Sequence, residues 1–377
     1  MAGEVREPEV THVTVTGRIT PLNSEDHVKL CYLAYRFRKN LVRAVKMYAR
    51  GVDKQVIVKE ITRELNLGYA DTIYKMAKLI VEGARGNGSK PLKIKVRKLF
   101  IASRGFSANK GNRNIRLEST NTLYVNIPRE GWVKFKVSFG EKYIPLVKEL
   151  IELAKSRKYS YGARIVFRNG RIYLHLSVPV ELYLKYFGKG EARGSLIAGF
   201  DLNSDRVNMV IVDKSGVIRD ARTEWFPEVT SHGFPRNRAK VARLQALSKL
   251  IEYAYHHGVG VAVFEDLDRI KRRRFTCSPV ANRKMSWFPK RKLLGHGVVM
   301  ALKHGFNVYL VDPSYTSVVG GYLSRELGLD KHTASAYMLT AKYLGLDLKS
   351  LKVTQITRKP KTKQHTDSPR LLYLAVI

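Results

Sequence analysis

The chain has 377 residues, 44% of them hydrophobic, which is enough for two or three domains with buried cores. Its 68 Lys and Arg residues exceed its 32 Asp and Glu residues and give a formal net charge of +36. An enzyme of small metabolites does not need this excess, which is typical of a protein that neutralises many phosphates, although a ribosome-associated protein or a merely solvated basic surface would also have it.

The first half of the chain combines strand-like and helix-like patterns. Residues 11–19 alternate between apolar and polar side chains, which predicts a β-strand. The period then changes, and residues 23–89 predict a helical segment. From Lys90 the two-residue period returns. We therefore expect residues 1–22 and 90–184 to form an antiparallel β-barrel domain into which the helical segment is inserted.

Basic residues recur along this barrel domain. Alternation over 92–97 predicts a strand with one basic face. A single lysine on a strand is most simply a solvated residue, but repetition on several strands beside aromatic residues favours a nucleic-acid interface. The contacts predicted on this basis are Lys93, Lys95, Arg97, Arg104, Lys110 and Arg113.

The second half has a different order of elements. Residues 185–195 have the composition of a linker. Two or three antiparallel strands within 196–225 precede a basic helix over 236–257, after which strands and helices alternate. This is the order of a ribonuclease-H-like fold, so we expect a mixed-sheet α/β nuclease domain over 196–350. Residues 351–377 predict a basic C-terminal tail.

Three carboxylates stand at the predicted ends of elements in this second half. Asp201 and Glu265 each end an apolar run, and Asp330 begins a helical stretch. Each alone is a weak signal, because Asp often caps a turn after a strand. On strand and helix ends that one fold brings together, the three predict a catalytic site that holds two Mg²⁺ or Mn²⁺ ions for phosphodiester hydrolysis.

Other polar groups near these carboxylates have weaker predicted roles. His332 could contact a phosphate or orient a ligand, or it could lie on a helix surface. Strand alternation points Asp266 away from Glu265. The basic loop after Glu265 predicts a clamp on a nucleic-acid strand, or else a solvated loop. Its arginines are Arg269, Arg272, Arg273 and Arg274.

The sequence predicts neither a membrane protein nor a zinc protein. No apolar stretch reaches about 18 residues, and residues 1–7 lack the apolar core of a signal peptide. Cys31 and Cys277 are too few for a disulfide framework or a cysteine zinc ribbon. We therefore expect a cytoplasmic protein of a prokaryote, and the scarcity of glutamine is a weak sign of a thermophilic archaeon.

The sequence resembles the TnpB (OrfB) family of transposon-encoded RNA-guided nucleases, which are relatives of type V CRISPR effectors. The resemblance is carried by Gly199-Phe200-Asp201-Leu202-Asn203, Val263-Phe264-Glu265-Asp266-Leu267, Val311-Asp312-Pro313-Ser314-Tyr315-Thr316-Ser317, Asp330 with Thr333-Ala334-Ser335-Ala336, and the basic segment 94–117. It implies a RuvC-type nuclease domain with Asp201, Glu265 and Asp330 as metal ligands. It also implies a wedge barrel with a helical recognition insertion, and a guide RNA from the transposon end.

The chain departs from that family in one respect. The family's motif at Ser317 is normally followed by a four-cysteine zinc ribbon, whereas here Asp330 follows only thirteen positions later without any cysteine. Three functions stay open: an RNA-guided, metal-dependent endonuclease that cuts double-stranded DNA, an RNA-guided DNA binder or regulator that cuts weakly, and an unguided transposase or nuclease. The retained carboxylates favour the first. The oligomeric state is left open.

Overall fold

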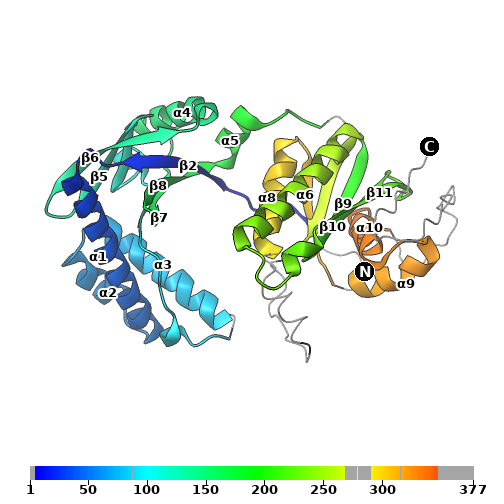
Figure 1. Ribbon diagram of the computed structural model, residues 1–377, viewed down its shortest axis with the longest axis horizontal. Coiled ribbons are helices and arrows are strands. Elements are labelled where there is room, and N and C mark those ends of the chain that lie inside the picture. The colour runs from blue at the N-terminus through cyan, green and yellow to red at the C-terminus, as the bar shows by residue number, and fades with distance from the viewer. Residues whose placement is uncertain are drawn as a thin grey trace. The chain divides into compact units, whose positions relative to one another are not determined.

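The computed structural model describes residues 5–86, 88–192, 194–267, 278, 290–314 and 316–346. The chain divides into two compact units (Figure 1). The first unit is Thr11–Tyr186, and the second unit combines Met1–Val10 with Phe187–Ile377. The predicted tail 351–377 and the predicted arginine loop lie outside the described residues.

The first unit is built on a seven-stranded antiparallel sheet. Its strands are β2 (His12–Thr20), β3 (Phe100–Ser103), β4 (Ile115–Ser119), β5 (Thr122–Ile127), β6 (Gly131–Phe139), β7 (Gly162–Arg168) and β8 (Arg171–Pro179). They are ordered β3-β7-β8-β2-β6-β5-β4. Buried and exposed residues alternate along β2 and β6, so one face packs into a core. The sheet curls into a half-barrel, which confirms the antiparallel, barrel-like fold expected from the sequence.

Helices and short 3₁₀ segments complete the first unit. They are α1 (Ser24–Ala49), α2 (Lys54–Thr62), α3 (Leu67–Gly86), η1 (Pro91–Lys93), η2 (Ser107–Asn109), η3 (Glu141–Tyr143), α4 (Ile144–Lys155) and α5 (Val180–Phe187), whose last residue already belongs to the second unit. Asn23 and Asp53 cap α1 and α2 by accepting hydrogen bonds from backbone N–H groups. Tyr69 of α3 packs edge-on against Phe37 of α1 and donates its hydroxyl to the Asn126 carbonyl of β5. The helical segment is therefore fixed to the sheet.

The predicted strand over 92–97 is wrong. Residues 91–93 form a 3₁₀ turn, and the segment that follows has no strand partner in the described sheet. Instead the guanidinium of Arg38 in α1 donates to the Val96 carbonyl at 2.9 Å. Alternation of apolar and basic residues here reflects packing of an extended segment against a helix, not a place in the sheet.

The second unit contains a six-stranded mixed sheet. Its strands are β9 (Leu196–Leu202), β10 (Arg206–Val212), β11 (Ile218–Trp225), β12 (Val259–Glu265), β13 (Asn307–Val311) and β1 (Val5–Arg6), in the order β1-β13-β12-β9-β10-β11. β9, β12 and β13 are parallel, and β10 runs antiparallel between β9 and β11. This order and these directions are those of the ribonuclease-H-like fold, as the sequence predicted.

Helices cover both faces of this sheet (Figure 1). They are η4 (Pro227–Thr230), α6 (Arg236–His256), α8 (Lys290–Lys303), α9 (Thr316–Leu327) and α10 (Lys331–Tyr343). One core contains Phe200 and Phe264 with residues of α6 and α8, and a separate core contains Val263 with residues of α10. Because side chains alternate across a strand, odd-numbered residues of β9 face α10 and even-numbered residues face α6 and α8.

Part of the N-terminal segment does not belong where the sequence placed it. Residues 1–22 were predicted to be part of the barrel domain; β2 does lie in that sheet, but Val5 and Arg6 pair antiparallel with β13 of the second unit. A two-residue strand carries no periodic signal, so its sheet could not be predicted from the pattern. The helix over Thr316–Leu327 was also not predicted.

Candidate active site

Asp201 and Glu265 lie side by side at the carboxyl ends of two adjacent parallel strands. Phe200 of β9 pairs with Phe264 of β12, and their rings stack with centroids 4.9 Å apart on the face covered by α6 and α8. The next residue of each strand is the carboxylate, so both carboxylates point to the opposite face, toward α10. Both are nearly buried, with Asp201 4% and Glu265 7% exposed.

The buried carboxylate of Glu265 is held in a strongly charged environment. Burial raises its pKa, and the negative charge of Asp201 raises it further, while the positive charges of Lys290 and Lys342 oppose the rise. The ammonium group of Lys290 donates to Oε2 of Glu265 at 2.5 Å. Lys342 Nζ donates to the Asp312 carbonyl at 2.9 Å. Cationic groups thus partly compensate two carboxylates that repel each other.

Asp330 is joined to this pair through His332. Asp330 is the N-cap of α10, and its Oδ1 accepts from the backbone N–H of His332 at 3.0 Å. The ring Nδ1 of the same His332 lies 3.4 Å from Oδ2 of Asp201. One residue therefore contacts both acidic groups, and His332 has the orienting position that the sequence left open.

A second chain of hydrogen bonds also connects Asp330 with the strands. The Thr333 hydroxyl donates to Oδ2 of Asp330 and accepts from Nδ2 of Asn208 at 3.0 Å. Asn208 is completely buried and lies directly opposite Asp201 in the β9–β10 pairing, so both side chains face α10. Its Oδ1 has no hydrogen-bond partner. The site therefore contains a buried amide oxygen with an unused acceptor.

The oxygen donors of this site are of the chemical type that binds a hard divalent cation, but the described residues bring too few of them together to hold one. Carboxylate and amide oxygens are the ligands that Mg²⁺ and Mn²⁺ prefer. Within the described ranges, however, no three His, Cys, Asp or Glu side chains are grouped closely enough to hold a metal ion. The structure brings Asp201 and Glu265 together, whereas Asp330 is linked to Asp201 only indirectly, through His332. The role of the three as metal ligands stays a prediction.

Sequence patterns missed several groups of this site. Lys290 is 25 residues from Glu265, and the stretch between them is largely outside the described residues. Asn208 has no signal apart from the strand register. Asp266, which the alternation pointed away from Glu265, is 1% exposed and accepts two hydrogen bonds from the Arg6 guanidinium at 2.6 and 2.8 Å. Arg269, Arg272, Arg273 and Arg274 lie outside the described residues, so their predicted contacts stay untested.

The predicted basic contacts of the first unit lie in two places. Lys93, Lys95 and Arg97 are exposed on the extended segment beside α1. Arg104, Lys110 and Arg113 lie on the loop between β3 and β4, where the Arg113 guanidinium stacks over the Phe106 ring at 4.4 Å. Asp71 of α3 lies 3.3 Å from Arg104 and 3.8 Å from Arg113, so part of this charge is paired.

Buried Asn112 fixes the shape of that loop. Its Nδ2 donates to the carbonyls of Ser103 and Tyr161, and its Oδ1 accepts from the N–H groups of Asn114 and Ile115. All four hydrogen-bonding positions of the amide are therefore used inside the protein. The basic side chains on either side of Asn112 project from a rigid loop.

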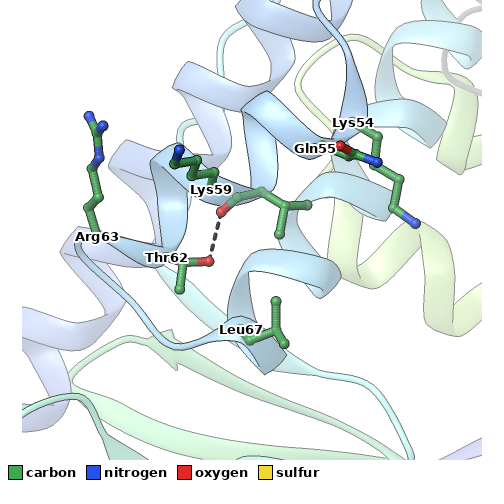
Figure 2. A pocket seen from close by; sticks show the side chains of 7 residues that line it. Lys54, Gln55, Lys59, Thr62, Arg63 and Leu67 are labelled. Atoms are coloured by element: carbon green, nitrogen blue, oxygen red, sulfur yellow. Dashed lines mark hydrogen bonds between the residues drawn. The ribbon is translucent and has the colours of Figure 1, made fainter.

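A concave surface next to this loop combines basic and apolar residues. A pocket of about 620 Å³ lies along α2, and Figure 2 shows Lys54, Lys59 and Arg63 extending from that helix near Leu67. An adjoining pocket of about 450 Å³ shares Lys54, Val58 and Leu67 with the first and reaches the loop. Its further lining includes Lys75, Arg104, Phe106 and Arg113. We call these two pockets the α2 groove. Cations beside exposed apolar and aromatic surface are suited to phosphates and unstacked bases.

Together, the fold and the carboxylate pair define a protein of the ribonuclease-H-like class. In the parts of the chain that the structure describes, no helix has the length and apolar character needed to cross a membrane. Comparison with curated proteins finds the uncharacterized protein SSO2105 of Saccharolobus solfataricus, 40% identical over 345 residues that cover 89% of this chain and 92% of the relative. The chain therefore belongs to the SSO2105 family.

Other comparisons agree with this placement. The family model of the SSO2105 N-terminal domain matches residues 12–188. An uncharacterized protein of Aeropyrum pernix is 25% identical over 248 residues, covering 61% of this chain and 67% of the relative. Both source organisms are thermophilic archaea, which agrees with the source suggested by the composition.

Two solved structures are similar at low identity. A Cas12f1–sgRNA–target DNA complex contains a chain with 11% identity and a TM-score of 0.46, and the match covers 85% of this chain and 82% of that one. T. thermophilus RuvC in complex with a Holliday junction has 17% identity and a TM-score of 0.27, covering 39% of this chain and 91% of that one. The ribonuclease-H-like fold of the second unit follows from its strand order and strand directions.

Proposed function

We propose that the protein is a nuclease that hydrolyses phosphodiester bonds with the help of divalent metal ions. The observation that carries the proposal is the buried pair Asp201 and Glu265, whose mutual repulsion and burial raise the pKa of Glu265. Keeping two such carboxylates together in the ionised form requires compensating positive charge. A pair of divalent cations would supply that charge and would stabilise both oxygens of a phosphodiester displacement.

The residues of the chain have distinct parts in this proposal. Asp201 and Glu265 would hold metal, with Asp330 as a further ligand and Asn208 Oδ1 as a neutral donor. His332 and Thr333 fix the orientation of Asp201 and Asp330 by the contacts described above. Lys290 provides a cationic group next to Glu265 that can also contact a substrate phosphate.

The more specific proposal is an RNA-guided DNA endonuclease of the transposon-associated TnpB type. It is supported by the motifs around the three carboxylates, by the net charge of +36, and by a barrel-like unit with a helical segment and a basic groove. A guide RNA and a double-stranded DNA target would be its partners, and Mg²⁺ or Mn²⁺ its cofactors.

A second candidate is a nucleic-acid binder or regulator with little cleavage. The observation that favours it is the 2.5 Å contact of Lys290 with Glu265, because an ammonium group there already neutralises the carboxylate that a metal would need. An unguided transposase or nuclease would use the same carboxylates without RNA.

Cleavage assays on the purified full chain distinguish these candidates. Labelled double-stranded and single-stranded DNA and RNA are incubated with Mg²⁺, Mn²⁺ or EDTA, before and after digestion of copurified RNA, which is also sequenced. Metal-dependent DNA cutting that needs RNA from the protein's own locus supports the guided nuclease. Cutting that survives RNA digestion supports the unguided enzyme. Tight binding without cutting in any metal contradicts the nuclease proposal and supports the binder.

The α2 groove should contribute to nucleic-acid affinity. Replacing Lys54 and Lys59 by Gln removes two cations from its lining, so affinity for RNA should fall about tenfold and its salt dependence should weaken. The matched control replaces Lys148 and Lys158, two exposed lysines elsewhere in the first unit, by Gln. Filter binding over a salt series measures both effects. Equal losses in the two double variants would show that the groove is only part of a diffuse positive surface.

The metal-free site should have a characteristic pH dependence. Unfolded Glu265 titrates near its ordinary pKa of 4.5, and the folded pKa is higher. Between these values the folded state keeps a proton that the unfolded state has lost, so the free energy of unfolding falls as pH rises through the folded pKa. Glu265→Gln should therefore be more stable than wild type at neutral pH, with an advantage that vanishes as pH falls toward 4.5.

Urea unfolding of both proteins in EDTA over a pH series tests this expectation. Groups remote from the site contribute equally to wild type and variant, so the difference reports Glu265 together with the charges that interact with it, which are Lys290, Asp201 and Lys342. An advantage of the variant that grows toward low pH would contradict the described environment of Glu265.

A further inference from the structure

A separate cationic pocket lies in the second unit, on the side of the mixed sheet covered by α6 and α8. Its volume is about 430 Å³. Phe234 and Leu293 are among its apolar lining residues, and no Asp or Glu is found among the described residues that line it. Its basic residues are Arg236, Lys240, Arg243, Lys292 and His296. We call it the α6–α8 pocket.

Arg243 brings a nearly buried charge to this pocket. It is 5% exposed, and its Nε and Nη2 donate to the Ser204 carbonyl at 3.3 and 3.2 Å. Removing a guanidinium from water is unfavourable, and burial accordingly lowers the pKa of Arg243. An anion in the pocket would interact favourably with this guanidinium.

Basic side chains from two helices line the pocket. Lys240 belongs to α6, whereas Lys292 and His296 belong to α8. Desolvation lowers the pKa of His296, and the positive charges of both Lys240 and Lys292 lower it further. Both lysines are therefore near enough to His296 for their charges to act on its ring. Such an arrangement favours an anionic ligand.

Two connections link this pocket to the carboxylate pair, which faces α10 on the other side of the sheet. Ser204, which accepts from Arg243, lies in the turn after β9, and Asn203 of the same turn donates to Oδ2 of Asp201 at 2.7 Å. The second connection is α8 itself, which begins at Lys290, the residue that contacts Glu265, and supplies Lys292 to the pocket. A nucleic-acid strand at the carboxylates could therefore extend into the pocket.

We propose that the α6–α8 pocket binds a phosphate group of a nucleic-acid strand, with Lys240, Lys292 and His296 around the phosphate, Arg243 at its base, and the attached base against Phe234. This proposal rests on the proposed nuclease function, because the occupant is taken to be the nucleic-acid strand bound at the carboxylates. The pocket would be a site that positions the strand, and none of the sequence motifs or the carboxylates had indicated it.

The test measures binding without catalysis. Affinity for a short single-stranded oligonucleotide is determined with the full chain in EDTA over a salt series, with a nucleoside monophosphate and inorganic phosphate as competitors. The test variant is Lys240→Gln with Lys292→Gln. The control variant is Lys249→Gln with Lys303→Gln, which removes the same two charges from the same two helices. Lys249 is paired with Glu224 away from the pocket, and Lys303 is at the other end of α8.

The test variant should bind the oligonucleotide about tenfold to a hundredfold more weakly, because two charged contacts to phosphate are lost. The slope of log affinity against log salt should fall by about 0.7, the contribution of one neutralised phosphate on a single strand. The control variant should change both values much less. Equal behaviour of the two variants would overturn the proposal.

The competitors distinguish the possible sources of the phosphate. One outcome would exclude a nucleic-acid strand as the occupant. In that outcome the test variant binds the oligonucleotide as well as the control variant does, but it no longer binds a nucleoside monophosphate that wild type binds. The pocket would then be a mononucleotide site. The outcome is independent of cleavage. If wild type never cuts DNA or RNA but the test variant loses binding, the nuclease proposal fails and the phosphate site stands.

Discussion

Asp201→Asn should abolish metal-dependent cleavage while leaving nucleic-acid binding nearly unchanged. The substitution keeps the shape of the side chain but removes one of two charges that face α10 at the ends of β9 and β12. Loss of a metal ligand costs several kcal/mol of transition-state stabilisation, which corresponds to a decrease in rate of about a thousandfold or more. Glu265→Gln and Asp330→Asn should have the same effect if all three residues hold metal.

The control for these variants is Asp213→Asn. Asp213 is a carboxylate of the same sheet that pairs with Arg219 and receives hydrogen bonds from its own turn. It follows β10, which runs antiparallel to β9, so it lies at the other end of the sheet from Asp201. Binding should persist in all four variants, because phosphate contacts elsewhere supply the affinity. An Asp201→Asn protein that cuts as fast as Asp213→Asn would exclude the carboxylate pair as the catalytic site.

The Asp330 variant discriminates between two versions of the site. If Asp330 only caps α10, Asn can accept the same backbone hydrogen bonds, so Asp330→Asn should retain most of the activity. If it is a metal ligand, activity should be lost as completely as with Asp201→Asn. Comparing the metal concentration needed for half-maximal cleavage by wild type and by this variant separates the two versions even when some activity remains.

Gly199→Ala should both destabilise the second unit and impair cleavage. A Cβ atom at Gly199 would lie 2.3 Å from the carbonyl oxygen of Ala336 and 2.8 Å from Cγ2 of Thr340, both in α10. The backbone of α10 would therefore have to move away from β9. Overpacking of this kind costs about 1–3 kcal/mol, and a neighbour that is backbone leaves little room for relaxation. Since Asp330 and His332 are positioned by α10, the contact of His332 with Asp201 should be lost as well.

Gly295→Ala is the matched control for that prediction. Gly295 is inside α8, and an added Cβ meets no atom within 4 Å. The same substitution should there stabilise the protein by about 0.5–1 kcal/mol, because Ala has the higher helix propensity. Thermal and urea unfolding should thus move in opposite directions for the two variants. Equal stability of the two would mean that α10 does not pack on β9 as described.

The sequence correctly predicted those elements that are determined by neighbouring residues in the chain. Alternation and the turns between strands predicted the order of strands from β9 to β13, because a buried parallel strand is an apolar run with polar residues at its ends. Asp201 and Glu265 could be selected for the same reason. The distance of Asp330 from this pair could not be predicted from the local sequence, because it depends on how α10 packs on the sheet.

Features that depend on contacts between distant segments could not be predicted. The segment 92–97 alternates between apolar and basic residues as a strand would, but it pairs with no described strand. Instead it lies against α1, where Arg38 donates to the Val96 carbonyl. Lys290 contacts Glu265 through a helix whose position follows from the core beneath it. Asn208 depends on the register between β9 and β10, which sets it opposite Asp201. None of these contacts between distant segments can be recognised from the spacing of residue types in the sequence.

The pairing of Arg6 with Asp266 has a consequence for how the protein is made. The two residues are 260 positions apart, and β1 can complete the sheet only against β13, near residue 311. During synthesis, Val5 and Arg6 therefore stay unpaired with β13 while the whole first unit, Thr11–Tyr186, is made. Contacts over such separations are slow to form. Asp266 acquires its Arg6 partner only when both ends of this long loop have met, so this edge of the sheet is completed late in folding.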